Sequence, residues 1–234
     1  MRQLPDQDPE QTVLGVLMLD TRFPRPCGDI GNPGSFSHPV IHRRLPGAIV
    51  SRVVTDQPLP DELANRFADA ARGLERDGAT LITTSCGFLY PLQDRLQAAV
   101  SVPVVTSALC LLPELRRQTA AGQPIGILTF DSAQLSAHHI PDAGPVVIEG
   151  LDPDDHLYRV IAGDLPRLDQ AIARMNAADA LHRLLSRHDQ LQAVILECTN
   201  LPPYKRDLSA VCHVPIFDIH DALNQLGTGG IGQD

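Results

Sequence analysis

Two cysteines, Cys86 and Cys198, have the residue type and the setting for acid–base chemistry. Each follows a short apolar run and precedes a predicted helix, in the contexts ATLITTSCGF (79–88) and QAVILECTNL (192–201). At such a junction the first backbone N–H groups of a helix and its dipole favour an anion. We therefore expect both thiols to have a lowered pKa and to react as thiolates. The matched contexts, one in each half of the chain, predict an internal duplication in which two thiols face one substrate.

The alternative for each of these cysteines is a buried structural thiol, which is common for this residue type. Glu197, directly before Cys198, would raise the pKa of that thiol if its carboxylate faced the site. The remaining cysteines, Cys27, Cys110 and Cys212, lack the strand-to-helix setting. No CxxC pair occurs, so zinc-type spacing is absent and we expect no metal site.

A second group of candidate residues consists of polar and Gly-rich segments. The motif GDIGNPGSF (28–36) contains Asn32 and lies in the Pro- and Gly-rich segment 20–47, which we interpret as a long ordered loop. Its N–H groups could hold an anion, or it could be a tight turn that needs Gly and Asn. Thr199 and Asn200 could cap a helix, face a ligand, or do both. A dinucleotide site is not expected, because GxGxxG is absent.

The elements that must position these residues follow from the hydropathy pattern. Amphipathic stretches, at 61–78, 92–100 and 168–188, predict helices. Apolar runs of strand length occur at 12–19, 47–54, 79–85, 102–108, 124–130, 145–150, 192–197 and 214–219. This pattern predicts an α/β fold with mainly parallel sheets, in which ligands bind at the carboxyl ends of the strands.

Composition limits the class of partner. The chain has 234 residues, of which 43% are hydrophobic, enough for one large domain or two small ones. A net charge of −9 argues against a nucleic acid or an acidic membrane as partner. Residues 1–11 are polar, and no apolar run approaches the ~20 residues of a membrane span. We therefore expect a cytoplasmic protein with reduced thiols that acts on a small molecule.

The motifs TTSCGF (83–88) and LECTNLPPY (196–204), with the early GDIGNP (28–33), resemble those of the aspartate/glutamate/hydantoin racemase superfamily. The resemblance covers nearly the whole chain in element order. It implies two pseudo-symmetric α/β lobes with mainly parallel sheets and an active site in the cleft between them. By analogy the first lobe comprises 1–115 plus 215–234 and the second comprises 116–214. A homodimer is common for this fold.

The resemblance also implies a reaction. Members of the superfamily racemise substrates without pyridoxal phosphate, metal or nucleotide. One cysteine thiolate removes the proton next to the substrate carboxylate, and the other cysteine, as a thiol, protonates the opposite face. Cys86 and Cys198 match these two positions. Fixed donors must meet the charge that develops on the carboxylate, and the candidates for binding it are Asn32, Ser85, Gly87, Thr129, Thr199 and Asn200.

Departures from the family pattern bear on the substrate. Gly87 and Phe88 follow Cys86, where glutamate and aspartate racemases typically have Asn-Thr, and Asn200 stands where glutamate racemases have His. We therefore expect a cofactor-independent racemase or epimerase of a small carboxylate, of the aspartate/glutamate amino-acid type, but not a dedicated glutamate racemase. The alternative is a maleate-type cis–trans isomerase or a decarboxylase on the same scaffold. A third hypothesis is a binding protein whose thiols are incidental.

Overall fold

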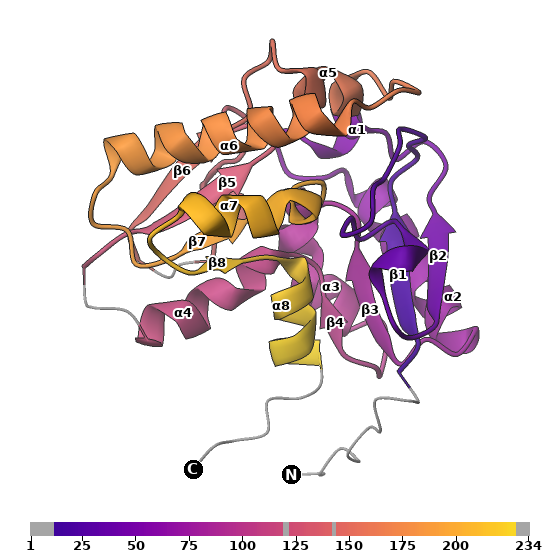
Figure 1. Ribbon diagram of the computed structural model, residues 1–234. Helices are drawn as coiled ribbons and strands as arrows, with labels where there is room; N and C mark the ends of the chain where they lie inside the picture. The colour runs from indigo at the N-terminus through magenta and orange to yellow at the C-terminus, as the bar shows by residue number, and fades with distance from the viewer. Residues whose placement is uncertain (1–11, 119–121, 142–143, 228–234) are drawn as a thin grey trace.

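Two parallel four-stranded sheets with the same strand order form the core of the protein. The computed structural model describes residues 12–118, 122–141 and 144–227. The first sheet, in the order β2-β1-β3-β4, comprises β1 (Leu14–Met18), β2 (Val40–Arg44), β3 (Leu81–Thr84) and β4 (Val104–Val105). The second, in the order β6-β5-β7-β8, comprises β5 (Ile125–Thr129), β6 (Val146–Gly150), β7 (Val194–Leu196) and β8 (Ile216–Phe217). Figure 1 shows the sheets side by side, so the predicted two-lobed α/β fold is confirmed.

The central strands are mainly apolar because helices and loops cover both of their faces. Every residue of β1, β3, β5 and β7 is buried. The helix α2 (Asp61–Arg76) packs on β1 and buries Leu63, Phe67 and Leu74 at helical spacing. In the second lobe, α6 (Gln170–Arg187) packs on β5 and β6. The predicted helices at 61–78 and 168–188 are therefore confirmed.

Shorter elements connect the strands. The remaining α-helices are α1 (Val50–Val53), α3 (Gln93–Gln97), α4 (Leu112–Gln118), α5 (His156–Ala162), α7 (Lys205–Val211) and α8 (Ile219–Ala222). The 3₁₀ turns are η2 (Pro33–Ser35), η3 (Gly87–Leu92), η4 (Ala108–Leu111), η5 (Ala137–His139) and η6 (Pro202–Tyr204), and a π-helical turn covers Leu223–Gly227. The predicted helix at 92–100 is thus the shorter α3 in the structure.

Two sequence-based assignments are wrong in the first lobe. The apolar run 47–54 was expected to be a strand, but it contains α1, in which Val50 and Val53 are buried while Ser51 and Arg52 are exposed. The strand that replaces it is β2, inside the segment 20–47 that was expected to be a loop. This strand pairs with β1 alone and lies at the edge of the sheet, so it does not need a continuous apolar run.

The end of the chain connects the two lobes. Strand β8 belongs to the second sheet, so the expected assignment of 215–234 to the first lobe does not hold for this strand. Helix α8, which follows it, contacts η4 in the first half of the chain. Residues 1–11, which were noted as polar, and residues 228–234 both belong to the expected first lobe and lie outside the described residues.

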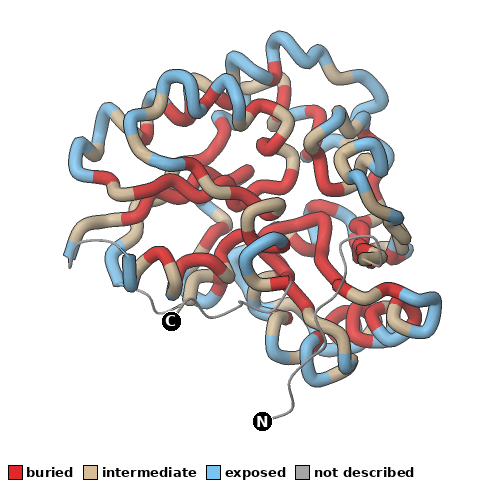
Figure 2. The backbone as a smooth tube through the Cα atoms, turned by 60° about the horizontal axis from the view of Figure 1, so that its bottom comes forward, coloured by how far each residue is buried: buried red, intermediate tan, exposed pale blue. Residues whose placement is uncertain are grey.

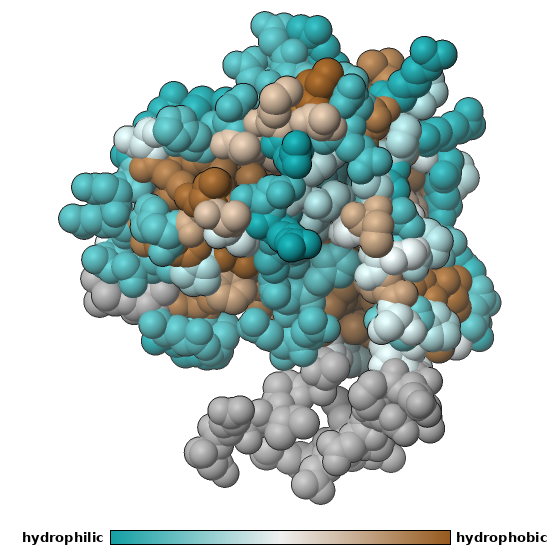
Figure 3. Space-filling view, viewed as in Figure 1, coloured by the Kyte–Doolittle hydropathy of each residue, from teal (hydrophilic) through white to brown (hydrophobic). Residues whose placement is uncertain are grey.

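The buried core runs through both lobes. Buried residues of the two sheets belong to one hydrophobic cluster, which passes through the region where the lobes meet (Figure 2). Polar side chains cover most of the face seen in Figure 3, with smaller apolar areas between them. In the part of the chain that the structure describes, no helix is both long and apolar enough to cross a membrane.

Candidate active site

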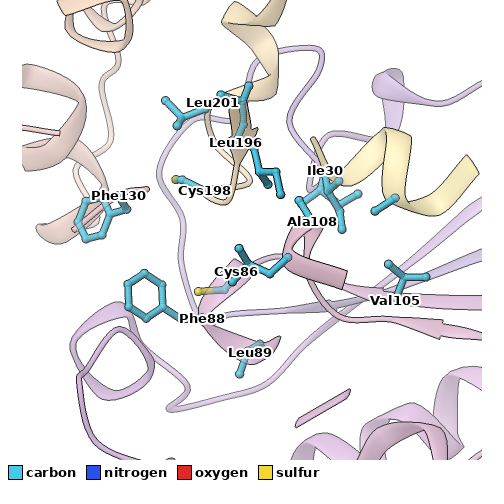
Figure 4. Packing of buried hydrophobic residues seen from close by; sticks show 14 of the residues in the cluster. Ile30, Cys86, Phe88, Leu89, Val105, Ala108, Phe130, Leu196, Cys198 and Leu201 are labelled. Atoms are coloured by element: carbon cyan, nitrogen blue, oxygen red, sulfur yellow. The ribbon is translucent and has the colours of Figure 1, made fainter. Parts of the chain in front are cut away.

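The two cysteines lie at equivalent positions of the two sheets. Cys86 follows β3 and Cys198 follows β7, the strands that occupy the same place in each strand order. Both side chains are buried. Figure 4 shows them directed to the same side, toward the rings of Phe88 and Phe130. Both thiols line one cavity, so the structure brings together the two cysteines that the sequence singled out.

The cavity contains about 350 Å³ of space between atoms, part of it open to solvent. It lies between the lobes, because segments of both contribute to its wall. The apolar wall consists of Leu19, Phe23, Val50, Val54, Phe88, Phe130 and Ile161, and the polar lining residues are Arg25, Ser85, Glu197, Thr199 and Asn200. Among the lining residues, Arg25 and Glu197 therefore supply one cationic and one acidic side chain to an otherwise neutral space.

The segments that carry the cysteines contact each other directly. Thr199 Oγ1 donates a hydrogen bond of 2.7 Å to the backbone oxygen of Ser85. Gly87 lies so close to Glu197 that a Cβ at this position would be 2.3 Å from both the backbone oxygen and Oε1 of that residue. Glycine is required here because another residue approaches its Cα closely.

We expect Gly87→Ala to destabilise the protein by about 1–3 kcal/mol or more, because its methyl group would overlap the Glu197 backbone. Urea unfolding monitored by circular dichroism measures the effect. Gly34→Ala is the matched control, since a Cβ there would meet only the Asn32 side chain, at 3.2 Å. Equal stability of the two variants would contradict the close contact.

The pKa values of the two thiols differ from the sequence-based expectation. Burial raises the pKa of Cys86 and of Cys198, and the charge of Glu197 raises both further. The N–H groups of Phe88 and Asn200 act in the opposite direction, as expected for a turn after a strand, but they do not outweigh burial. The expectation of a lowered pKa is therefore wrong, and each cysteine is a thiol at neutral pH.

Glu197 is a buried acid with one unpaired oxygen. Its side chain is fully buried, and Oε2 accepts a hydrogen bond of 2.6 Å from Thr129 Oγ1. The other oxygen, Oε1, is buried without a hydrogen-bond partner. Burial raises the pKa of Glu197 from 4.5 to about 7, although the Thr129 hydrogen bond lowers it. This acid is therefore the group lining the cavity whose charge changes near neutral pH.

The raised pKa of Glu197 predicts a pH-dependent stability. The folded state binds its proton more tightly than the unfolded chain between pH 4.5 and about 7, so the free energy of unfolding falls as the pH rises through this window. The loss reaches about 3 kcal/mol at most. We expect the free energy of unfolding of Glu197→Gln not to fall in this way. The stability of the variant relative to the wild type should therefore be higher at pH 8 than at pH 5. Denaturant titrations at both pH values measure the difference.

The exposed Glu62 provides the control for this comparison, because Glu62→Gln changes the same functional group at the surface. We expect its stability to follow the wild type at both pH values. An identical pH dependence of Glu197→Gln and the wild type would show that Glu197 is ionised in the folded protein.

A chain of hydrogen bonds links a buried ion pair to Cys198. Asp29, which is 1% exposed, accepts from Arg25 Nη1 at 2.8 Å, from Gly31 N at 2.7 Å and from Asn200 Nδ2 at 2.6 Å. This last bond fixes the orientation of the Asn200 amide. The Oδ1 atom of Asn200 accepts a hydrogen bond from Cys198 Sγ at 3.7 Å. The chain thereby favours the protonated form of Cys198.

The other predicted donors differ in their placement. Ser85, Gly87, Thr199 and Asn200 line the cavity, whereas Asn32 and Thr129 are not among its lining residues. The Asn32 side chain caps η2 by accepting from Gly34 N and also donates to the Arg25 backbone oxygen. Thr129 reaches the site through its hydrogen bond to Glu197.

Several lining residues were not singled out from the sequence. Phe23 and Arg25 come from the segment 20–47, and Phe130 follows β5. Asp164 of the second lobe holds this segment in place, because its Oδ1 accepts from the backbone N–H of Arg22 at 2.5 Å and of Phe23 at 2.8 Å. Among the described residues, no three His, Cys, Asp or Glu side chains form a group that could hold a metal ion.

The sequence matches a family whose members are described as Asp/Glu/hydantoin racemases, over residues 40–226. Similar curated proteins carry a different activity in their names. Dimethylsulfoniopropionate lyase 3 of Emiliania huxleyi is 30% identical over 91% of this chain and 58% of its own length. Dimethylsulfoniopropionate lyase 7 of the same alga is 30% identical over 92% of this chain and 66% of its own length. The dimethylsulfoniopropionate lyase of Durusdinium sp. clade D is 29% identical over 92% of this chain and 74% of its own length.

Solved structures share the fold at lower identity. Arylmalonate decarboxylase superposes with a TM-score of 0.57 at 16% identity, covering 94% of both chains. An aspartate racemase homologue from Pyrococcus horikoshii OT3 superposes with a TM-score of 0.53 at 21% identity, covering 92% of this chain and 98% of that one. Solved structures with this fold thus include a decarboxylase and an aspartate racemase homologue, so the reaction must be argued from the site.

Proposed function

Because this chain belongs to the Asp/Glu/hydantoin racemase family, we propose that it is a lyase that removes the proton next to a carboxylate and expels a leaving group from the neighbouring carbon. The proposed substrate is dimethylsulfoniopropionate, the compound in the names of the similar algal proteins. The observation that carries the proposal is the lining of the cavity, in which two thiols share the space with one guanidinium and one buried carboxyl group. We assign the carboxylate end of a short zwitterion to the guanidinium, which keeps N–H groups beyond those bonded to Asp29 and Thr21, and its cationic end to the carboxyl group.

Cys86 is the proposed base. Burial and Glu197 raise the pKa of both thiols, but the smaller influences differ, since Arg25 lowers the pKa of Cys86 and Asp29 raises that of Cys198. The Asn200 oxygen also accepts a hydrogen bond from the Cys198 thiol. We therefore assign the thiolate to Cys86 during the reaction and the thiol to Cys198.

The elimination balances without a further reactant. The Cys86 thiolate takes the proton from the carbon next to the carboxylate, the electrons of that C–H bond form the C=C bond, and the C–S bond breaks. Its electrons leave on sulfur as neutral dimethyl sulfide, and the other product is acrylate. Negative charge develops on the α-carbon and the carboxylate in the transition state. Arg25 and the Ser85 hydroxyl, whose oxygen accepts from Leu19 N, line the cavity and are the donors that we assign to this charge.

Proton NMR of the protein mixed with dimethylsulfoniopropionate tests the activity. We expect the S-methyl signal of the substrate to disappear while vinyl signals of acrylate appear. A substrate spectrum that stays unchanged over hours at micromolar protein would contradict the proposal.

Racemisation of an amino acid is the second candidate, because thiols from two equivalent strands line the same cavity. The same experiment in D₂O with aspartate and glutamate separates the two. Deuterium replacing the α-proton without elimination would favour the racemase, whereas acrylate from the sulfonium compound would favour the lyase.

A further inference from the structure

We propose that Glu197 and the rings of Phe88 and Phe130 form a subsite for a methylated onium group, and that an onium ligand expels the proton of Glu197 when it binds there. This inference rests on the proposed function, because it assigns the part of the cavity that would hold the sulfonium end of the substrate. The inference also predicts the ligand specificity of the subsite, which binds a methylated cation in preference to a primary ammonium group or a neutral group of the same shape.

The first supporting observation is the unpaired oxygen of Glu197. Its Oε1 is buried and without a hydrogen-bond partner, although the residue lines the cavity. A buried carboxylate needs a counter-charge or a proton, since desolvation of an isolated charge is unfavourable by several kcal/mol. Its raised pKa of about 7 shows that a proton can neutralise Glu197. A cation in the cavity would neutralise it equally well and release that proton to solvent.

The second observation is the character of the surrounding wall. Phe88 and Phe130 line the cavity together with Ile161 and Val54, so this wall offers ring surfaces and aliphatic carbon. Phe130 stacks on Tyr158 with ring centroids 4.5 Å apart, and Phe88 meets His139 edge to face at 5.0 Å, so both rings are held in position. Aromatic rings attract cations, and methylated onium ions use this attraction because they have no N–H groups to satisfy.

The hydrogen-bonding capacity of the wall argues against a primary ammonium group. Such a group carries three donors, as in lysine, and each must find an acceptor when it is buried. Glu197 has one oxygen without a hydrogen bond, because Oε2 already accepts from Thr129, and the hydroxyl of the neighbouring Thr199 already donates to Ser85. A dimethylsulfonium or trimethylammonium group leaves no donor unpaired in this place.

The subsite also accounts for the protons of the proposed reaction. Binding of the onium substrate releases one proton from Glu197 to solvent. The Cys86 thiol then passes its proton to the Glu197 carboxylate and becomes the thiolate that takes the α-proton. Departure of neutral dimethyl sulfide removes the cation, and Glu197 and Cys86 end the cycle protonated, as they began. The proton lost on binding is the one proton that the elimination yields overall.

Isothermal titration calorimetry with two unreactive ligands tests the subsite without depending on turnover. Dimethylsulfonioacetate carries its sulfonium on the carbon next to the carboxylate and has no β-carbon to eliminate from. 3-Methylbutanoate has the same shape and the same carboxylate, with an uncharged CH group in place of the sulfonium. Titrations at pH 6, in two buffers of different ionisation enthalpy, give both the affinity and the number of protons released. We expect the sulfonium ligand to bind about tenfold or more tightly than its isostere, with release of close to one proton.

Variants separate the parts of the proposal. Glu197→Gln is expected to abolish proton release and to bring the two affinities within about threefold of each other, while Phe88→Leu weakens only the sulfonium ligand, by about threefold or more. Cys86→Ala is expected to keep both the preference for the sulfonium ligand and the proton release.

Equal affinities of the two ligands for the wild type, or no proton release, would overturn the subsite even if the protein cleaves dimethylsulfoniopropionate. A preference with proton release would support the subsite even if the protein does not cleave that compound.

Discussion

Replacing Cys86 by alanine is expected to reduce the rate of elimination by at least about 10³-fold, because the group that takes the α-proton is removed. Exchange of the α-proton with D₂O is expected to be lost together with elimination, since both begin with the same proton transfer. Cys198→Ala is expected to have a smaller effect, because this thiol is held protonated by Asn200. The measurement is the initial rate of acrylate formation and of deuterium incorporation for the wild type, Cys86→Ala and Cys198→Ala.

The control for this prediction is another cysteine of the same chain. Cys212 follows α7 and is not among the residues that line the cavity, so Cys212→Ala is expected to keep wild-type rates. Full activity of Cys86→Ala combined with an inactive Cys198→Ala would reverse the assignment of the base. Full activity of both variants would show that neither thiol moves a proton.

The sheets were predictable where burial makes the sequence simple. Strands β1, β3, β5 and β7 are buried throughout, so their sequences are mainly apolar and do not alternate, with threonines only at the ends of β3 and β5. The run at 47–54 has the same composition, but a four-residue helix that buries Val50 and Val53 cannot be distinguished from a strand by hydropathy alone. The edge strand β2 carries polar residues, so its pattern did not indicate a strand.

The candidate site was predictable only where its residues are neighbours in sequence. Ser85, Gly87, Thr199 and Asn200 adjoin the cysteines, and all of them line the cavity. Other lining residues, such as Arg25 and Phe130, come from separate segments that only the fold brings to the cavity. The direction of the thiol pKa shifts was wrong because the sequence shows the local N–H donors but not how deeply the fold buries each sulfur.

The buried position of Asp29 leads to the second large effect. Asp29→Ala would leave the Arg25 guanidinium, which is 10% exposed, without its carboxylate, and would leave the Gly31 N–H and the Asn200 amide without an acceptor. Breaking a buried ion pair from one side typically destabilises a protein by about 3–5 kcal/mol. We expect a loss of this size in the free energy of unfolding, measured by denaturant titration.

Two further variants show whether the buried charge, and not the deletion itself, causes this loss. Asp77→Ala breaks an ion pair with Arg43 whose carboxylate is 51% exposed, and it is expected to change stability by less than about 1 kcal/mol. Adding Arg25→Leu to Asp29→Ala removes the uncompensated guanidinium, so the double variant is expected to be more stable than the sum of the single effects predicts. Additive losses would contradict the coupling. Because Asp29 also holds Arg25, which lines the cavity and is proposed to meet the developing charge, a folded Asp29→Ala protein is also expected to have a lower kcat.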